Sequence, residues 1–395
     1  MLVIIPRFPY PPHDGFNLRV WNLYRLLSRK VDLMMLCGLQ ESPSSETLET
    51  CLSEGLDIKA VPVFQRNRIS EFVKKLYFLL GRYPVWTAGF YFSEVRHYLE
   101  RLLQREKFDL IAMESTWLGR YWSLLEAQPA PKILVLHDLD SEKWHRQAAL
   151  LPLGRHKLNC LYNAAGFRHL ENRLLGRTDL TFVTSERERA SLLLRNKSLS
   201  VEIVPNGVDS DTLQPLPVSN SRELLFVGSL SYLPNTDGLL FFIGEVMPEL
   251  RRRFPELTCI IAGKKAPDEI RSLHGTNGVE VVGEVPDLEP YYRRCAVSVV
   301  PIRAGSGTRL KILEAMAWGR PIVSTTLGCE GLDVRNREHL LIADRPGDMA
   351  NAIGELLTSP DLSRSIVHNA RRLVEERYSW KTISEKVYLN LLNLI

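Results

Sequence analysis

The chain has 395 residues, of which 45% are hydrophobic and 24% are charged, and its formal net charge at pH 7 is +4. These values are those of an ordinary globular protein of two or three domains, and they exclude collagen-like, disordered and disulfide-rich classes. The nearly balanced charge gives no reason to expect a nucleic-acid partner, and no apolar run reaches the roughly 18 residues that a membrane span needs.

The six cysteines lack C-x-x-C spacing, and the opening apolar run, Met1–Pro6, is too short for a secretion signal. Both features favour a cytoplasmic protein with neither a zinc site nor a disulfide framework. The opening run instead predicts a buried first strand.

Short apolar runs then alternate with amphipathic stretches, a pattern typical of parallel βαβ units. The first series predicts strands at Leu2–Ile5, Val31–Leu36, Asp109–Met113, Ile133–Leu136 and Leu180–Thr184, with helices at Asn17–Ser28 and Glu94–Arg105. The second series predicts strands at Leu224–Val227, Thr258–Ala262, Val279–Val282, Val297–Val300 and Pro321–Ser324, with helices at Asp237–Phe254, Glu289–Cys295 and Leu310–Trp318.

A stretch rich in Pro, Gly and Asn separates the two series. We therefore expect an α/β protein with two Rossmann-like, doubly wound domains, residues 1–203 and 223–378, joined by a linker at 204–222. Ligands of such sheets bind beyond the carboxyl ends of the strands, so two domains that face each other would form a binding cleft there. The chemically informative residues should therefore follow the strands.

The loop after the first strand runs from Arg7 to Gly15 and leads into a helix that carries Arg19. Gly15 lets a ligand approach the backbone closely, and the N-terminus of a helix favours an anion. Arg19 can add a charge-assisted hydrogen bond to a phosphate. The alternative interpretation is a tight turn followed by a surface arginine.

A second polar stretch follows the strand at Ile133–Leu136. Asp138 and Asp140 form a D-x-D pattern that can hold a divalent metal, but Asp140 can equally cap the helix that follows. We favour the cap, and so predict no metal site. His137 is either a polar contact to a substrate or a core histidine with its hydrogen bonds satisfied.

The most informative loop follows the strand at Val297–Val300. Gly305 and Gly307 open the backbone on either side of Ser306, and Thr308 can cap the next helix. Exposed N–H groups at that helix terminus predict a phosphate-binding turn. It is not a Walker loop, because G-x-x-x-x-G-K-[ST] is absent. The alternative is a glycine-rich turn with solvated charges.

Two cations and one acid lie at the start of the same helix. Arg309 and Lys311 stand beside the expected phosphate position, and Glu314 shares a helix face with Lys311 because the two are three residues apart. A carboxylate in that place can accept hydrogen bonds from sugar or ribose hydroxyls.

With these motifs, the chain resembles the retaining GT-B glycosyltransferases of family 4, the group 1 glycosyl transferases. The resemblance covers nearly the whole chain and is strongest in its second half. The matching segments are Val204–Asp209, Leu225–Ser229, Ala262-Gly263, Val282–Val285 and Glu314–Pro321. The sequence Gly-Ser-Gly-Thr-Arg-Leu-Lys, with the loop Tyr-Leu-Pro-Asn, is similar to a sub-branch of sugar transferases from bacterial polysaccharide systems.

The resemblance implies a nucleotide-sugar donor that is bound mainly by the C-terminal domain. Glu314 would bind the ribose hydroxyls, and the backbone near Ser306, Gly307 and Thr308, beside Gly305, would contact the sugar and the diphosphate. Gly283, Glu284 and Val285 match the loop that touches the base, and Gly228 lies in the loop after the first strand of that domain. Gly15 and Arg19 would close on the phosphates, His137 would lie close to the reacting sugar, and residues 379–395 would form a helix that crosses back to the N-terminal domain.

The chain departs from the family pattern at two points. Ser306 replaces the first acid of the E-x7-E motif, which leaves the identity of the sugar open. The usual Arg and Lys after the first strand of the C-terminal domain are also absent, although the leaving diphosphate still needs positive charge. Arg309 and Lys311 are the candidates to supply it as catalytic groups, so no metal or other cofactor is required.

The resulting hypothesis is a retaining transfer of a sugar from a nucleoside diphosphate to an acceptor hydroxyl, in polysaccharide or glycolipid synthesis. A non-catalytic nucleotide-sugar-binding subunit and a sugar-nucleotide 2-epimerase are the alternatives. The acceptor would be a carbohydrate or a lipid-linked molecule. Residues 66–83 interleave basic and apolar side chains, which predicts either contact with the inner face of the membrane or a core helix with a solvated basic face.

Overall fold

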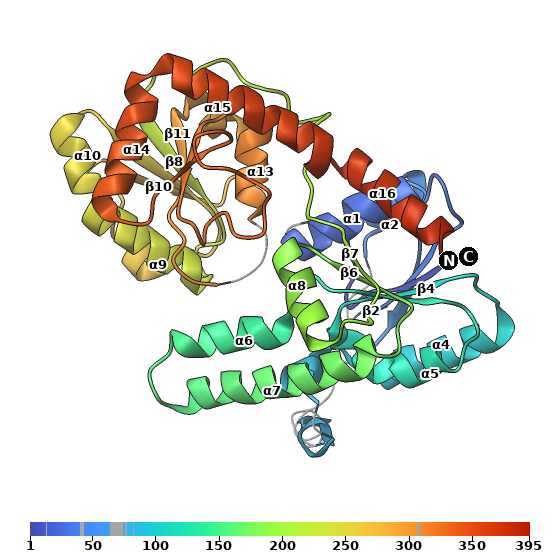
Figure 1. Ribbon diagram of the computed structural model, residues 1–395. Helices are drawn as coiled ribbons and strands as arrows, with labels where there is room; N and C mark the ends of the chain where they lie inside the picture. Colours follow the sequence, from blue (N-terminus) through green and yellow to red (C-terminus); the bar gives the residue numbers. More distant parts are fainter. Residues whose placement is uncertain (13, 40–42, 64–73, 76, 82, 306–308) are drawn as a thin grey trace. The chain divides into compact units, whose positions relative to one another are not determined.

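The computed structural model describes residues 1–12, 14–39, 43–63, 74–75, 77–81, 83–305 and 309–395. The chain divides into two compact units (Figure 1). Unit 1 comprises Met1–Pro205 and Ile383–Ile395, and unit 2 comprises Asn206–Thr382. Each unit is built on one wholly parallel sheet with helices, so the predicted α/β class with two Rossmann-like domains is confirmed.

The sheet of unit 1 has the strand order β3-β2-β1-β4-β5-β6-β7. Its strands are β1 (Leu2–Ile4), β2 (Met34–Leu39), β3 (Asp57–Pro62), β4 (Ile111–Glu114), β5 (Lys132–Val135), β6 (Leu180–Val183) and β7 (Val201–Ile203). The sequence did not predict β3 and β7. Both are edge strands, where one side of the strand has no neighbour and a continuous apolar run is not needed.

Ten helical segments of unit 1 are described. They are α1 (Gly15–Leu27), α2 (Ser45–Ser53), η1 (Val85–Phe90), α4 (Ser93–Arg105), η2 (Thr116–Tyr121), α5 (Trp122–Glu126), α6 (Asp140–Ala149), α7 (Arg155–Leu175), α8 (Glu186–Arg195) and α16 (Trp380–Leu392). Helices α6 and α7 pack along each other as a hairpin that extends from the rest of the unit (Figure 1).

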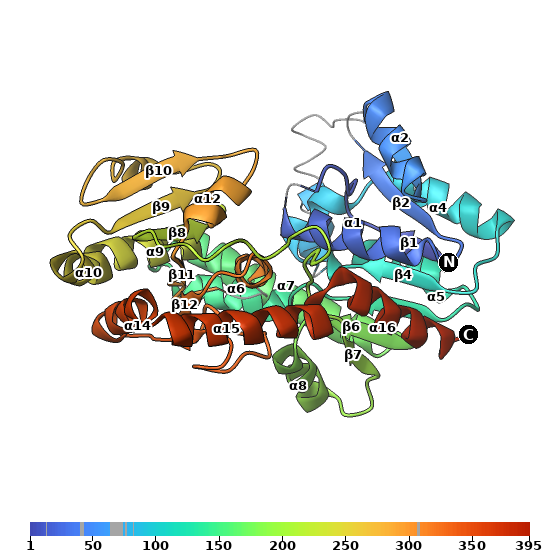
Figure 2. The ribbon, with the colours of Figure 1, turned by 90° about the horizontal axis from the view of Figure 1, so that it is seen from above.

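Unit 2 repeats the arrangement with the order β10-β9-β8-β11-β12-β13. Its strands are β8 (Glu223–Val227), β9 (Thr258–Ala262), β10 (Val279–Gly283), β11 (Val297–Val300), β12 (Ile322–Ser324) and β13 (Leu341–Ile342). Its helices are α9 (Leu233–Phe241), η3 (Phe242–Val246), α10 (Met247–Arg253), α11 (Asp268–Arg271), α12 (Glu289–Arg294), α13 (Leu310–Ala317), α14 (Pro346–Thr358), α15 (Pro360–Leu373) and η4 (Val374–Tyr378). Figure 2 shows β10, β9 and β8 in succession across this sheet.

The helix predicted at Asp237–Phe254 is divided into α9, η3 and α10. The middle segment is a π-helical turn, in which the N–H of Met247 bonds to the carbonyl of Phe242. Pro248 follows directly and cannot donate a backbone hydrogen bond. A widened π-helical turn is one way in which a helix accommodates a missing backbone hydrogen bond.

The segment proposed as a linker packs onto unit 2 from Asn206 onward. Val208 belongs to the apolar core of that unit. Arg371 of α15 donates hydrogen bonds to the carbonyl oxygens of Ser210 (2.7 Å), Leu213 (2.5 Å) and Ala317 (2.8 Å). One half-buried guanidinium therefore fixes this segment and also satisfies the carbonyl of Ala317 in the last turn of α13, where carbonyls lack helical partners.

At the other end of the chain, most of α16 groups with unit 1. Lys386 donates a hydrogen bond to the carbonyl of Ile203 (3.0 Å), and Lys30 of unit 1 pairs with Glu385.

Candidate active site

The two central strands of unit 2, β8 and β11, define the point where the strand order of the sheet reverses. From β8 the chain continues to β9 on one side, and from β11 it continues to β12 on the other. In open α/β sheets, ligands bind at the carboxyl edge next to such a point. Of the predicted donor-binding residues, Gly228 and Gly305 lie in the loops after these two strands and Glu314 lies in α13.

Lys311 is the centre of this arrangement. Its Nζ donates a hydrogen bond to Oδ1 of Asn235 in α9 (3.0 Å) and lies 4.1 Å from the centroid of the Phe226 ring in β8. The amide nitrogen of Asn235 in turn donates to the carbonyl of Ser229 (2.7 Å). The ammonium group is thus held against the loop after β8, although Lys311 belongs to the helix after β11.

Gly228 makes that position possible. A Cβ atom at residue 228 would lie 2.7 Å from Nζ of Lys311 and 2.9 Å from Nδ2 of Asn235, closer than non-bonded atoms approach. Any side chain at this position would therefore displace the ammonium group.

Gly305 shapes the other side of the turn. Its φ angle is +99°, and a Cβ atom there would lie 3.0 Å from both the hydroxyl of Tyr232 and Cγ of Pro234. The Tyr-Leu-Pro-Asn segment, Tyr232–Asn235, therefore packs directly on the glycine turn. Arg309 occupies the N-cap position of α13, with its Nη2 3.4 Å from the carbonyl of Ala304.

Three of the predicted donor-binding residues, Ser306, Gly307 and Thr308, lie outside the described residues. Their predicted contacts with the sugar and the diphosphate stay predictions.

Burial and charge both act on Lys311. Burial and, to a lesser extent, the charge of Arg309 together lower the pKa of Lys311 to about 7, and the carboxylate of Glu314 opposes this shift. Burial also raises the pKa of Glu314, against the effect of Lys311. Within the described parts of the chain, no side chain forms an ion pair or a hydrogen bond with the carboxylate of Glu314. The turn therefore presents cationic groups and an acid whose oxygens can accept hydrogen bonds from hydroxyls.

The loops after β8, β9 and β10 are joined through glycines. The N–H of Gly228 donates to the carbonyl of Ala262 (3.0 Å), and that of Gly263 donates to the carbonyl of Gly283 (2.7 Å). Gly283 has a φ angle of +72° and leads to Glu284 and Val285. The segment predicted to touch the base thus belongs to the same sheet edge as Lys311.

In unit 1, the predicted His137 belongs to a buried group of three polar side chains. Its Nε2 lies 2.5 Å from Oε2 of Glu114, the last residue of β4. The hydroxyl of Tyr24 in α1 donates to the other oxygen of Glu114. The Glu114 carboxylate therefore orients the imidazole ring and accepts the Nε2 proton, which leaves Nδ1 as an acceptor when the ring is neutral.

An aromatic side chain covers one face of the His137 imidazole. The Phe16 ring stacks on it at 4.3 Å between centroids, and Trp117 stacks on Phe16 at 5.6 Å. Burial lowers the pKa of His137, and the carboxylate of Glu114 opposes this shift. The neutral ring is thus the form that the surroundings favour near neutral pH.

Gly15 and Arg19 are both on α1, but they differ in surroundings. Gly15 is exposed at the first turn, where the Asp14 carboxylate already accepts a hydrogen bond from the N–H of Asn17 (3.0 Å). Arg19 is only 1% exposed and donates to the carbonyl of Pro205 (2.8 Å). Contact of either residue with phosphate stays a prediction.

The two aspartates of the D-x-D pattern have separate protein partners. Asp138 pairs with Lys143 at 2.8 Å. Asp140 accepts hydrogen bonds from the hydroxyl of Thr116 and from Nε1 of Trp117, each at 2.9 Å. In the described part of the chain, no group of three or more His, Cys, Asp or Glu side chains is placed to hold a metal ion.

Most of the stretch predicted to touch a membrane, residues 66–83, lies outside the described residues. In its described part, Lys74 is buried with its Nζ 5.0 Å from the centroid of the Phe92 ring, so this cation faces the protein. Tyr77, Leu79 and Leu80 are exposed. Among the helices described, none is both long and apolar enough to cross a bilayer.

Sequence reasoning missed four residues of these sites: Tyr24, Glu114, Tyr232 and Asn235. Glu114 follows directly after the predicted strand Asp109–Met113, and that place alone could have marked it. Asn235 lies in the loop that replaces the family's usual cations. The partner of Tyr24 is 90 residues away in the chain, so no local pattern could have indicated the pair.

Comparison with known proteins identifies the family. Residues 221–359 match the model of the glycosyl transferases group 1, and residues 52–212 match that of glycosyltransferase family 4. Two Rossmann-like units, each built on a parallel sheet, are the architecture of GT-B glycosyltransferases. The chain belongs to the group 1 glycosyltransferases.

Curated relatives match over about half of their length. An uncharacterized 44.6 kDa protein in the cps region of Klebsiella pneumoniae is 27% identical over 173 residues, which are 42% of this chain and 45% of the relative. The phosphatidyl-myo-inositol mannosyltransferase of Mycolicibacterium smegmatis is 27% identical over 195 residues, 47% of this chain and 50% of the relative. The chain therefore spans about half the length of the curated relatives that it matches.

Solved structures share the fold over nearly the whole chain. Sucrose-phosphate synthase from Thermosynechococcus elongatus is 19% identical, covers 100% of this chain and 99% of its own, and has a TM-score of 0.69. Anabaena HepE in complex with UDP and glucose is 14% identical, covers 99% of this chain and 98% of its own, and has a TM-score of 0.66. At these identities the likeness concerns the fold.

Proposed function

We propose that the protein transfers a sugar from a nucleoside-diphosphate sugar to an acceptor hydroxyl. One observation carries the proposal: the ammonium group of the half-buried Lys311 is held against Asn235 and Phe226 at the switch point of unit 2, next to Arg309 and to the glycines Gly228 and Gly305. Burying a cation is costly unless a negative charge compensates it. A diphosphate that binds at this turn supplies that charge.

The proposed reaction retains the anomeric configuration and needs no metal. The bond between the anomeric carbon and the diphosphate oxygen breaks, and the acceptor oxygen bonds to the same face of that carbon. The acceptor proton moves to the leaving phosphate. Negative charge grows on that phosphate in the transition state, where Lys311, Arg309 and the N-terminus of α13 can stabilise it. Glu314 would hold the ribose hydroxyls.

We propose that unit 1 binds the acceptor and that His137 takes part through Nδ1. The ring is oriented by Glu114, and its free nitrogen can accept a hydrogen bond from a hydroxyl group. The proposed acceptor is a carbohydrate or a lipid-linked sugar. A relative is named a phosphatidyl-myo-inositol mannosyltransferase, and this name supports a lipid-linked acceptor. The proposed reaction would then belong to polysaccharide or glycolipid synthesis.

A panel of UDP-, GDP- and ADP-sugars tests the donor. A ligand that binds only the folded protein at 100 times its Kd adds about 2.7 kcal/mol of stability, so sugars of one base should raise the melting temperature of the full chain. The same donors are then incubated with and without simple glycosides and lipid-linked sugars, and the anomeric configuration of the product is read by NMR. The absence of both a thermal shift and any product would contradict the proposal.

The same panel separates the two alternatives. An epimerase would change the donor without an acceptor, and the altered sugar nucleotide would be visible by NMR. A non-catalytic subunit, the reading that Ser306 in place of an acid keeps open, would show the thermal shift but neither transfer nor epimerisation. Either result replaces the transferase assignment.

We also propose that unit 1 contacts the cytoplasmic face of a membrane. The hairpin of α6 and α7 exposes Leu150, Leu153 and Leu158 around its tip, next to Arg155 and Lys157. Farther along α7, the hydroxyl of Tyr162 is 3.4 Å from the carbonyl of Leu79, so the exposed Leu79 and Leu80 lie beside this hairpin. Apolar side chains among cations are typical of segments that lie in an anionic membrane surface.

A double charge insertion tests the membrane contact. Leu80→Asp with Leu153→Asp should lower the fraction that sediments with anionic liposomes at least threefold, because both side chains are largely exposed (76% and 88%) and would be repelled by the lipid charge. Leu194→Asp is the control, since Leu194 is equally exposed (85%) on α8. Equal binding of all three proteins, or no binding of the wild type, would rule out this surface.

A further inference from the structure

Unit 2 contains a second cavity, of about 510 Å³, at the edge of the sheet opposite to the candidate active site. Arg222, Ala296 and Pro321 line it, and each of them directly precedes a strand, namely β8, β11 and β12. The residues of the candidate active site follow the carboxyl ends of β8 and β11. The cavity is therefore a separate site, and its volume is within the range of small-molecule pockets.

The wall of this cavity is cationic and apolar. Its charged and titratable side chains are Arg222, Arg320, Arg364, Arg371 and His368. No aspartate or glutamate belongs to the lining among the residues that the structure describes. Leu216, Leu356 and Val367 provide apolar surface between the cations.

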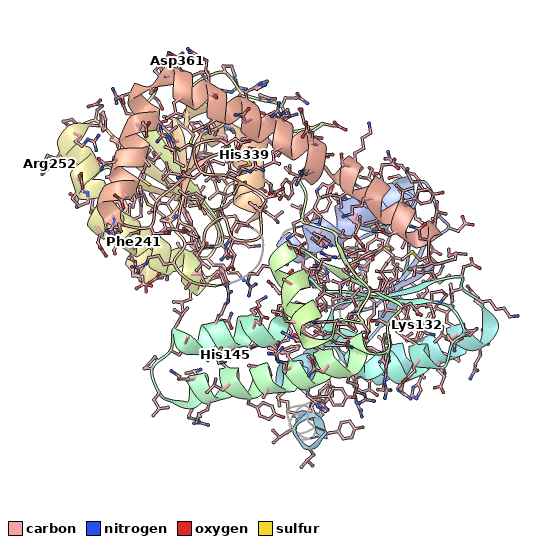
Figure 3. The ribbon with its side chains drawn as sticks, viewed as in Figure 1. Lys132, His145, Phe241, Arg252, His339 and Asp361 are labelled. Carbon is pink, nitrogen blue, oxygen red and sulfur yellow. The ribbon has the colours of Figure 1, made fainter. Side chains whose placement is uncertain are left out.

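Three of the four arginines have a carboxylate partner. The ion pairs are Arg222 with Glu256 (3.4 Å), Arg364 with Asp361 (2.5 Å) and Arg371 with Glu375 (2.6 Å). Asp361, labelled in Figure 3, lies in the first turn of α15. Each of these three guanidinium charges is therefore partly compensated by a carboxylate that is not part of the cavity lining.

Arg320 differs from these three. It is 2% exposed, and its Nη2 donates to the carbonyl of Pro217 (2.7 Å). In the described structure it forms no ion pair, and its buried Nε has no hydrogen-bond partner. A buried guanidinium without a counter-charge is costly, since an arginine stays protonated even when burial lowers its pKa. An anion in the adjacent cavity would compensate that charge.

We propose that this cavity binds an organic phosphate that carries an apolar group. The phosphate would pair with Arg320, because a guanidinium matches the geometry of phosphate oxygens. The apolar portion would pack on Leu216, Leu356 and Val367. The proposal does not depend on the transferase activity, since no residue of the candidate active site lines this cavity.

Phenyl phosphate is the probe, and inorganic phosphate and phenol are the control ligands that carry only its anionic or only its apolar group. Isothermal titration calorimetry on the full chain should show saturable binding of phenyl phosphate, at least tenfold weaker binding of inorganic phosphate, and none of phenol. Arg320→Met and Arg364→Gln should each weaken the binding of phenyl phosphate about tenfold or more. Arg364 is largely exposed (62%), so its replacement tests the site even if Arg320→Met does not fold.

Two controls locate the binding. Arg372 lies on α15, like Arg364, and its side chain is similarly exposed (60%), but it does not line the cavity. Arg372→Gln should therefore leave the affinity for phenyl phosphate unchanged. Lys311→Met should also leave it unchanged. The proposal is overturned if phenyl phosphate shows no saturable binding, if Arg372→Gln weakens it as much as Arg364→Gln, or if only Lys311→Met abolishes it.

Discussion

Lys311→Met should lower the rate of sugar transfer about 100-fold or more and, at the same time, raise the melting temperature by about 3 °C or more. The loss follows from the role proposed for Lys311, since methionine cannot stabilise the charge that grows on the leaving phosphate. The gain follows from its partial burial, because folding removes part of the hydration of the ammonium group. Methionine keeps the packing over Phe226 without this cost.

The stability part of this prediction depends on pH in a defined direction. The pKa of Lys311 falls from 10.5 to about 7 in the folded protein, so between these values the unfolded chain binds the extra proton. Wild-type stability from this group therefore rises as the pH increases from 7 to 10.5. The advantage of Lys311→Met should be largest near pH 7 or below and should shrink toward pH 10.

Donor binding should show the opposite trend. A bound diphosphate favours the charged lysine, so above pH 7 the wild type must take up a proton on binding, and its affinity should fall about tenfold per pH unit. Calorimetry in buffers of different ionisation enthalpy measures that uptake. Lys311→Arg is the control, because arginine stays protonated and its donor affinity should not fall in this way.

Two results would contradict the assignment of Lys311. One is near-wild-type turnover in Lys311→Met, which would show that the lysine does not act on the transition state. The other is lost activity with a lower melting temperature, which would indicate a structural role instead. Loss of function with a gain in stability is expected of a group that is buried for catalysis.

The central strands could be predicted because helices cover both of their faces, and this environment requires a nearly continuous run of apolar residues. Thr258–Ala262 and Val297–Val300 have the predicted bounds, since strands covered by helices on both faces are apolar over most of their length. The two-residue strand β13 and the edge strands β3 and β7 lack such an apolar run. Their positions follow from pairing with a neighbour that is already in place, which is a tertiary effect.

The candidate site likewise combines features that are local in sequence with features that depend on tertiary structure. The turn around Gly305 and the spacing of Lys311 and Glu314 are local, so the sequence could indicate them. The approach of Lys311 to Asn235 joins residues 76 positions apart, and it depends on β8 and β11 being neighbours in the sheet. Sequence patterns can thus indicate which groups line a site, but which of them touch is decided by strand order.

Gly263→Ala should destabilise unit 2 by about 3 kcal/mol or more, because no side chain fits between the loops after β8 and β9. A Cβ atom at residue 263 would lie 1.7 Å from the carbonyl oxygen of Gly228 and 2.8 Å from its carbonyl carbon. Both are backbone atoms, so no rotamer change relieves the overlap and the loops must separate. We expect the melting temperature to fall by roughly 6 to 12 °C.

The same substitution should weaken donor binding beyond its effect on stability, since the displaced carbonyl belongs to Gly228, the residue beside the ammonium group of Lys311. Gly244→Ala is the matched control: Gly244 lies in η3 of the same unit, and a Cβ atom there meets no other atom within 4 Å. Its melting temperature should equal that of the wild type or exceed it slightly, because alanine favours a helix. If both variants melt like the wild type, the two loops are not as close as the structure has them, and the site built on Gly228 loses its support.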